Sequence, residues 1–149
     1  VKSSSCFYIL THSLGAPAQT EVTLSTDCDP IDELIAWFSE KINFMISKGV
    51  NTEQIIIDPG IGFGKTAIQS QRILKDIDKL YGLGLRILVG HSRKSFLSPL
   101  AQSSPEGRDP ESIGCSLALA EAVVDILRVH NPSLHIRAFR GWSYIRRDQ

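Results

Sequence analysis

The chain has 149 residues, which is enough for one domain with a substantial core. Lys and Arg together number 16, as do Asp and Glu, so the formal net charge is zero, and nothing in this balance favours nucleic acid or an anionic membrane as a partner. No apolar run approaches the ~18 residues that span a bilayer, no signal-peptide pattern follows the first residues, and the cysteines lack metal-ligand spacing, as in a reduced, cytoplasmic protein.

Short apolar runs alternate with helical patterns along the chain. In chain order the pattern predicts a strand at 7–10, a helix from 30 to about 48, a strand at 55–57, a helix over about 73–81, a strand at 87–89, a short helix from about 95, a helix over 111–123, a strand at 125–130 and a helix from 132 toward 145. Some helix starts pair a capping side chain with a first-turn proline: Asp29-Pro30, Asp109-Pro110 and Asn131-Pro132. The polar stretches 13–28 and 103–109 are predicted loops.

This order predicts an α/β fold built from parallel βα units. Because connections through helices make right-handed crossovers, the strands should lie side by side in a parallel sheet. Two architectures fit the pattern: an open doubly wound sheet, or part of a TIM (β/α)8 barrel. A complete barrel takes roughly 250 residues, so the βα units of this chain amount to about half of one.

A glycine-rich loop directly follows the buried strand at 55–57. It reads Asp58-Pro59-Gly60-Ile61-Gly62-Phe63-Gly64-Lys65-Thr66. A Walker A motif would need glycine in place of Pro59, and the dinucleotide fingerprint needs a different glycine spacing, so neither nucleotide motif is present. Asp58 ends a buried strand beside a backbone that a ligand can approach closely. It is therefore suited to bind a planar pair of N–H donors, such as the edge of an aminopyrimidinone.

Two later strands also end in polar residues. The sequence Ser92-Arg93-Lys94-Ser95 places two cations just before a predicted helix start, where anions bind readily. Arg128 and His130 are two positions apart, so on a strand both side chains leave the same face. The pattern predicts a phosphate or pyrophosphate site at these strand ends. It assigns no metal ligands.

Three segments together resemble dihydropteroate synthase, the sulfonamide target of folate biosynthesis. They are Asp-Pro-Gly-x-Gly-Phe-Gly-Lys at 58–65, Val-Gly-x-Ser-Arg-Lys-Ser-Phe at 89–96 and Arg-Val-His at 128–130. The Ser-Arg-Lys element distinguishes this family from other pterin-binding barrels. The chain departs from the family at Asn131, where Asp is usual, and on both sides of His12, where Met is commoner. The tail at 137–149 matches no part of the family pattern.

The resemblance implies a pterin-binding TIM barrel of which residues 1–149 form the carboxyl-terminal half. It implies a transferase that condenses 6-hydroxymethyl-7,8-dihydropterin pyrophosphate with p-aminobenzoate to give 7,8-dihydropteroate and pyrophosphate. Mg2+ would assist, with its main ligand in the amino-terminal half of the barrel, which would lie in the same or another chain. A homodimer is a further expectation, and the chain alone is expected to be inactive.

The resemblance also assigns roles to residues of this chain. The expected catalytic residues are Asp58, Lys94, Arg128 and His130. The pterin ring would contact Asp58, Gly90 and Lys94. The expected p-aminobenzoate contacts are Phe63 and Ser95. Pyrophosphate would contact Arg128 and His130. Two further cations are expected close to the substrates: Lys65 and Arg93.

Two other functions remain open from the sequence. A half-barrel could keep affinity for a pterin or an anion without catalysis and act together with a partner chain. An open sheet with the same strand-end residues could instead belong to an enzyme that acts on phosphate esters.

Overall fold

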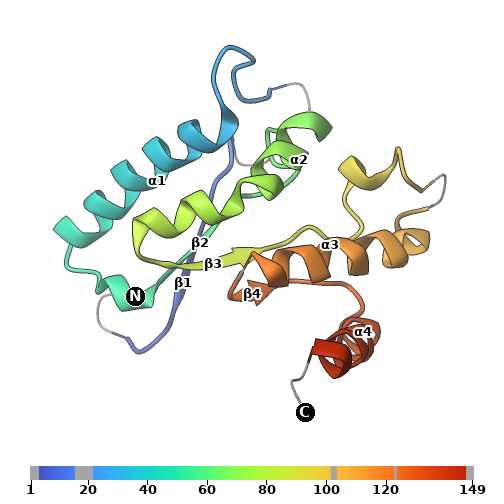
Figure 1. Ribbon diagram of the computed structural model, residues 1–149. Helices are drawn as coiled ribbons and strands as arrows, with labels where there is room; N and C mark the ends of the chain where they lie inside the picture. Colours follow the sequence, from blue (N-terminus) through green and yellow to red (C-terminus); the bar gives the residue numbers. More distant parts are fainter. Residues whose placement is uncertain (1–3, 16–21, 102–103, 123, 147–149) are drawn as a thin grey trace.

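The computed structural model describes residues 4–15, 22–101, 104–122 and 124–146 (Figure 1). The strands of this part form one parallel sheet in the order β1 (Tyr8–Thr11), β2 (Ile55–Asp58), β3 (Arg86–Val89) and β4 (Ile126–Leu127). Its α-helices are α1 (Pro30–Ser47), α2 (Ala67–Lys75), α3 (Asp109–Glu121) and α4 (Pro132–Arg146). Shorter 3-10 helices are η1 (Thr52–Gln54), η2 (Ile77–Leu83), η3 (Ser95–Leu97) and η4 (Pro105–Arg108).

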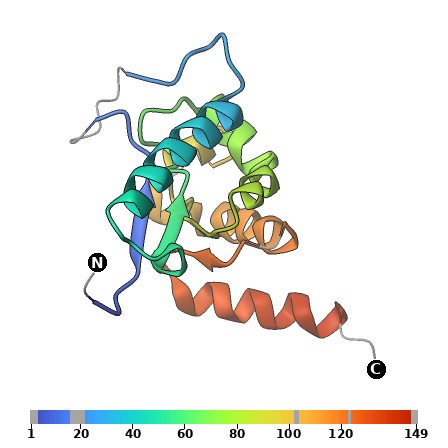
Figure 2. The ribbon, with the colours of Figure 1, turned by 90° about the vertical axis from the view of Figure 1, so that its left-hand side faces the viewer.

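The order of the strands decides between the two architectures. The strands lie in the sheet in sequence order and all pair in parallel, so every crossover turns the same way. Figure 2 shows the helices following one another in an arc from α1 through α2 and α3 to α4. A doubly wound sheet would reverse its strand order and carry helices on both faces. The fold is therefore a segment of a barrel wall, which confirms the half-barrel prediction.

The helix α1 begins and packs as its sequence predicts. Oδ1 of Asp29 accepts a hydrogen bond from the Ile31 backbone N–H at 3.1 Å, which caps the first turn. The apolar stripe of the helix is fully buried at Leu34 and Phe38 and shares one core with Ile57 of β2. Burying each such side chain contributes about 1.5–3 kcal/mol, so this stripe fixes which face of α1 meets the sheet.

The parallel register gathers the strand ends at one edge of the sheet. Thr11 lies opposite Asp58, and the His12 backbone N–H extends this pairing by donating to the Asp58 carbonyl at 2.9 Å. Between β3 and β4, Val89 lies opposite Leu127. The polar residues that follow these positions therefore lie along the same edge.

Several local predictions were wrong, among them the loop at 103–109, within which Pro105–Arg108 form η4. The second predicted helix is interrupted at Asp76, whose carboxylate is bound by Arg72 at 3.2 Å and Lys79 at 3.0 Å, and the chain continues as η2. The last strand was predicted over 125–130, but only Ile126 and Leu127 pair as strand. Asp109 was predicted to cap α3; it is instead the first residue of that helix, and its carboxylate binds Arg93.

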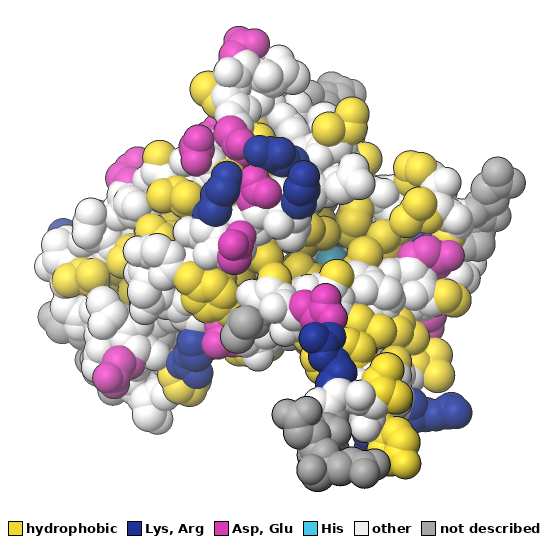
Figure 3. Space-filling model, in the orientation of Figure 1, with side chains coloured by type: hydrophobic (Ala, Val, Ile, Leu, Met, Phe, Trp, Pro, Cys, Tyr) yellow, Lys and Arg dark blue, Asp and Glu magenta, His cyan; other side chains and the backbone are white. Residues whose placement is uncertain are grey.

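Exposed apolar side chains include those at the open sheet edge and those around a hollow between two helices. At the open edge formed by β1, Phe7, Tyr8 and Ile9 are 58%, 41% and 45% exposed. Between α2 and α3, a hollow of about 490 Å³ is lined mainly by apolar side chains, among them Leu100 (Figure 3). Its described lining includes none of the polar strand-end residues.

Within the described residues, no helix has the length and apolar character that crossing a bilayer requires.

Candidate functional site

Asp58 lies at the end of β2 and is only 4% exposed. Its Oδ1 accepts a hydrogen bond from the Gly60 N–H at 2.8 Å, and its Oδ2 a longer one from the Thr11 hydroxyl at 3.4 Å. Burial raises the pKa of the Asp58 carboxyl, and the Gly60 N–H and the charges of Arg128 and Lys94 oppose that rise. The carboxylate keeps acceptor capacity beside two cations, which suits a ligand that presents N–H donors.

The glycine loop turns back against the end of β1. Gly60 has φ 65°, and a Cβ added there would lie 2.0 Å from the carbonyl oxygen of His12. Gly62 has φ 79°, and a Cβ there would lie 3.3 Å from Cδ of Lys94. Gly60 needs glycine for both backbone conformation and space, whereas Gly62 needs it for backbone conformation. The loop therefore holds its shape through close contacts within the protein.

Lys65 lies beneath this loop and is 8% exposed. Its Nζ donates to the carbonyl oxygens of Gly60 at 3.1 Å and Phe63 at 2.9 Å, and lies 2.9 Å from Nδ1 of His12. Burial lowers the pKa of Lys65 to about 8. Burial, together with the Lys65 charge, lowers the pKa of His12 to about 4. A neutral His12 ring can therefore accept from the ammonium, and Lys65 meets the loop rather than the open edge of the sheet.

We expect the folded chain to lose stability in mild acid because of His12. The native ring stays neutral down to about pH 4, whereas the unfolded residue takes up a proton near its ordinary pKa of 6.5, so protons favour the unfolded state. Between pH 6 and pH 5 the loss in unfolding free energy from this group should approach about 1 kcal/mol. Urea unfolding at both pH values measures it.

The matched variant for this prediction is His12→Asn. It keeps an acceptor for Nζ of Lys65 and removes the titration, so its unfolding free energy should fall less over the same pH range. The raised pKa of Asp58 acts in the opposite direction and is common to both proteins. Equal pH slopes in the two proteins would contradict the assignment to His12.

Lys94 crosses from the end of β3 to the glycine loop. Its Nζ donates to the Ile61 carbonyl at 2.7 Å and lies 3.9 Å from the centroid of the Phe63 ring. Burial and the nearby Arg128 lower the pKa of the Lys94 ammonium, and Asp58 opposes this. Lys94 thus joins an aromatic face to the buried carboxylate, an arrangement that could hold a flat, polar ring.

Arg128 lies over Gly90. Its backbone N–H donates to the Val89 carbonyl at 2.9 Å, which continues the pairing of β3 and β4 by one residue. A Cβ added at Gly90 would lie 2.5 Å from Nη2 of Arg128. Gly90 therefore leaves the space that the guanidinium occupies, within electrostatic reach of Asp58 and Lys94.

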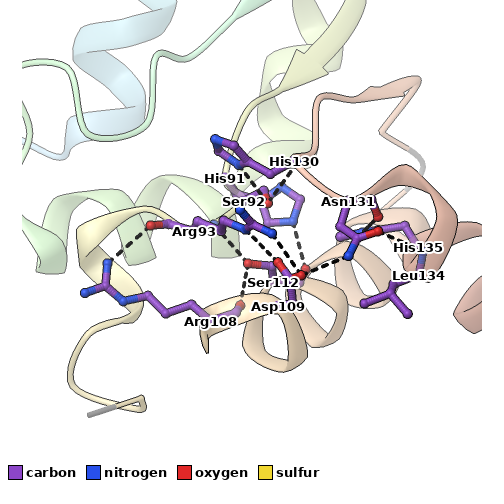
Figure 4. Close-up of polar contacts among 10 residues, drawn as sticks. All are labelled: His91, Ser92, Arg93, Arg108, Asp109, Ser112, His130, Asn131, Leu134 and His135. Carbon is purple, nitrogen blue, oxygen red and sulfur yellow. Dashed lines mark hydrogen bonds and ion pairs between the residues drawn. The ribbon is translucent and has the colours of Figure 1, made fainter. Parts of the chain in front are cut away.

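His130 is held at the end of β3 by a serine. Its backbone N–H and its Nδ1 lie 3.3 Å and 3.2 Å from the hydroxyl oxygen of Ser92 (Figure 4). Ser92 is buried, whereas His130 and Arg128 are exposed. Both exposed side chains follow β4 along the edge that carries Asp58. Because the strand ends at Leu127, the strand geometry from which a shared face was predicted does not extend to Arg128 and His130.

Two further predicted site residues, Arg93 and Ser95, do not lie as the sequence predicts. The Arg93 guanidinium binds both carboxylate oxygens of Asp109, at 2.8 Å and 3.1 Å (Figure 4). Ser95 is exposed and begins η3, a 3-10 turn of 3 residues. So short a turn aligns few peptide dipoles, and the helix-terminus argument for anion binding at Ser95 therefore fails. The exposed hydroxyl remains available as a hydrogen-bond donor.

No group of three or more His, Cys, Asp or Glu side chains within the described residues could hold a metal ion. The buried carboxylate of the site, Asp58, already accepts hydrogen bonds from Gly60 and Thr11.

Comparison with known proteins identifies relatives of this chain. A family model described as "Pterin binding enzyme" matches residues 1–130. A dihydropteroate synthase of Synechocystis is 42% identical over 125 residues, which cover 83% of this chain and 43% of the relative. A folate synthesis bifunctional protein of Chlamydia muridarum is 37% identical over 139 residues, or 91% of this chain and 31% of the relative.

A solved structure shows the same likeness in three dimensions. It is a dihydropteroate synthase of Anaplasma phagocytophilum with bound 6-hydroxymethylpterin-monophosphate, 35% identical with a TM-score of 0.83. The match covers 92% of this chain and 54% of that chain. This chain thus spans about a third to a half of the length of the proteins it matches.

Proposed function

This chain belongs to the family of pterin binding enzymes, and we propose that it forms the carboxyl-terminal half of a dihydropteroate synthase. One observation carries the proposal: a single sheet edge brings together Asp58, Lys94 and Arg128, which interact electrostatically although they come from different strand ends. A buried carboxylate beside two cations can bind a heterocycle with N–H donors next to an anionic group. Both features occur in a pterin pyrophosphate.

The pterin ring is proposed to bind at Asp58. The carboxylate would accept hydrogen bonds from the 2-amino group and the N3–H of the ring, a planar donor pair that matches its two oxygens. Lys94 would contact the same ring from its place over Phe63. The backbone at Gly90 would border the ring beneath Arg128.

The leaving group is proposed to bind at Arg128 and His130. Breaking the C–O bond between the pterin methylene and pyrophosphate leaves an electron pair, and thus negative charge, on the leaving oxygen. The positive charge that develops is spread over the pterin. The guanidinium and the imidazole would stabilise the departing anion. The amine of p-aminobenzoate then forms the C–N bond and loses a proton.

The p-aminobenzoate substrate is proposed to lie against Phe63, with its carboxylate near the Ser95 hydroxyl. Lys65 would contribute by holding the loop that carries Phe63, since its ammonium donates to the Phe63 carbonyl. When bound, Mg2+ would supply further charge neutralisation to pyrophosphate, with ligands from the amino-terminal half. That half, in the same or another chain, would complete the barrel, and we place the enzyme in the cytoplasm, with a homodimer as its expected assembly.

Reuniting the two halves tests this function. We expect no 7,8-dihydropteroate from the chain alone, and turnover when it is produced together with the preceding half of the Synechocystis enzyme. Turnover by the chain alone would contradict the proposal that the chain carries only half of the barrel. Binding of pterin and pyrophosphate without turnover in the reunited protein would favour a non-catalytic binding module. Absence of binding as well would overturn the proposal.

Gly90→Ala should weaken pyrophosphate binding without unfolding the chain. The new methyl would meet the far end of the Arg128 side chain at 2.5 Å, and that flexible end can move aside. Displacing the guanidinium should cost at most the roughly 1.5–3 kcal/mol of a hydrogen bond to a charged group. Calorimetric titration with pyrophosphate measures the affinity, and a thermal melt serves as the control. Unchanged affinity would show that the guanidinium binds no pyrophosphate in its present position.

A further inference from the structure

Arg93 has a strained backbone. It is the single residue other than glycine with positive φ, at 58°, within the described part of the chain. A residue with a Cβ is strained in this conformation, so the surroundings must hold it. The Arg93 N–H donates to the Ser112 hydroxyl at 2.9 Å, and its carbonyl accepts from Nη1 of Arg108 at 3.2 Å (Figure 4).

The side chain of Arg93 is held as firmly as its backbone. Its Nε and Nη2 each bind one oxygen of Asp109, at 2.8 Å and 3.1 Å. Nδ2 of Asn131 also donates to Oδ2 of Asp109 at 3.1 Å, a bond that an ionised Asp at this position could not donate. We call Arg93, Asp109 and Asn131 the brace. It joins the end of β3, the start of α3 and the residue after His130.

The strained residue lies between Lys94 of the proposed site and Ser92, which contacts His130 of that site. Ser92, before it, contacts the backbone N–H and Nδ1 of His130. Lys94, after it, extends to the Ile61 carbonyl. Three consecutive side chains therefore extend to three different parts of the chain: the segment after β4, the start of α3 and the glycine loop. The left-handed backbone at Arg93 allows the three side chains to point in different directions. Figure 4 shows the Arg93 side chain directed toward α3.

We propose that Arg93 and Asp109 are positioning residues: the brace holds the turn at 92–94 so that Lys94 and His130 face the same ligand. Arg93 then acts through Asp109 and does not touch the substrate. This inference rests on the proposed function, because it takes Lys94 and His130 as ligand-binding groups. It replaces the expectation that Arg93 lies against a substrate.

A double-mutant cycle separates the two roles of Arg93. Arg93→Gly removes the guanidinium and permits the left-handed backbone, and Asp109→Asn removes its charged partner. If Arg93 acts through Asp109, each variant should weaken pyrophosphate binding about 3- to 10-fold, and the double variant no more than the stronger single one. Losses that multiply in the double variant would show direct contact with the ligand and overturn the proposal. Arg93→Lys should recover part of the affinity.

A measurement without ligand keeps the test independent of the proposed function. In NMR spectra of the unliganded chain, Arg93→Gly and Asp109→Asn should shift the Lys94 amide and the His130 ring signals in the same direction. Arg72→Ala, which removes the ion pairs of α2 with Asp29 and Asp76, is the matched control and should leave both signals in place.

The outcomes of the two measurements are distinct. Unmoved Lys94 and His130 signals in both brace variants would overturn the positioning role, whatever the affinities. If the unmodified chain binds no pyrophosphate and the signals shift as expected, the proposed function fails and the structural part of the inference stands.

Discussion

Asp58→Asn should weaken binding of 6-hydroxymethylpterin by roughly 2–4 kcal/mol, which is about 30- to 1,000-fold in Kd. The carboxylate is 4% exposed, so both the carboxylate and the ligand groups that pair with it are removed from water. Asn would offer one acceptor and one donor where the pterin edge requires two acceptors. One donor of the ring would then face another donor in a buried place, and that mismatch accounts for the large loss.

The pH dependence of pterin binding gives a second measure of Asp58. Burial raises the pKa of this carboxyl, so acid should protonate it at a higher pH than an exposed Asp, and pterin affinity should fall there. In Asp58→Asn this acid-dependent fall should be absent. Isothermal titration over a pH series measures both effects.

Asp125→Asn is the matched control, because the Asp125 carboxylate binds the Ile87 N–H at 2.7 Å, at the other end of the same sheet. This control can lower stability, but it should leave pterin affinity unchanged. Equal pterin affinity in Asp58→Asn and the unmodified chain would leave Asp58 as a loop-ordering residue that holds the Gly60 N–H.

The parts of the site that the sequence predicts are those fixed by strand ends. Asp58 and Arg128 each follow a short apolar run, and parallel pairing brings such positions to one edge whatever the loops do. The direction of a side chain within a loop has no comparable signal. From the sequence alone, the Lys65 side chain is as compatible with contact to a ligand as with contact to its own loop. The structure decides between them, because it places His12, from another strand end, beside Nζ of Lys65.

The brace was hidden from the sequence for a related reason. Asp109 next to Pro110 is typical of a helix cap, and a local pattern cannot show that its carboxylate is already used by Arg93. The positive φ of Arg93 also has no sequence marker, since that conformation usually selects glycine or asparagine. Long-range partners decided both positions.

Arg128→Ala should weaken pyrophosphate binding by about 1.5–3 kcal/mol, the range for a hydrogen bond to a charged group. The guanidinium lies over Gly90, and the Arg128 backbone is fixed by pairing with Val89, so the side chain starts from a defined place on the sheet edge. Because the side chain is exposed, added salt should screen its attraction and weaken binding by the unmodified chain. The variant should show a smaller salt dependence.

Arg86→Ala is the control for this prediction, since Arg86 is also exposed but begins β3 at the opposite edge, where it donates to the Glu53 carbonyl at 3.1 Å. Gly90→Ala provides a second check, because it acts only by displacing the guanidinium and should add nothing in an Arg128→Ala background. Titration with pyrophosphate at two salt concentrations is carried out on the unmodified chain, the three single variants and the double variant. If Arg128→Ala and Arg86→Ala lose affinity equally, the chain binds pyrophosphate through general charge attraction, and Arg128 has no specific place in the site.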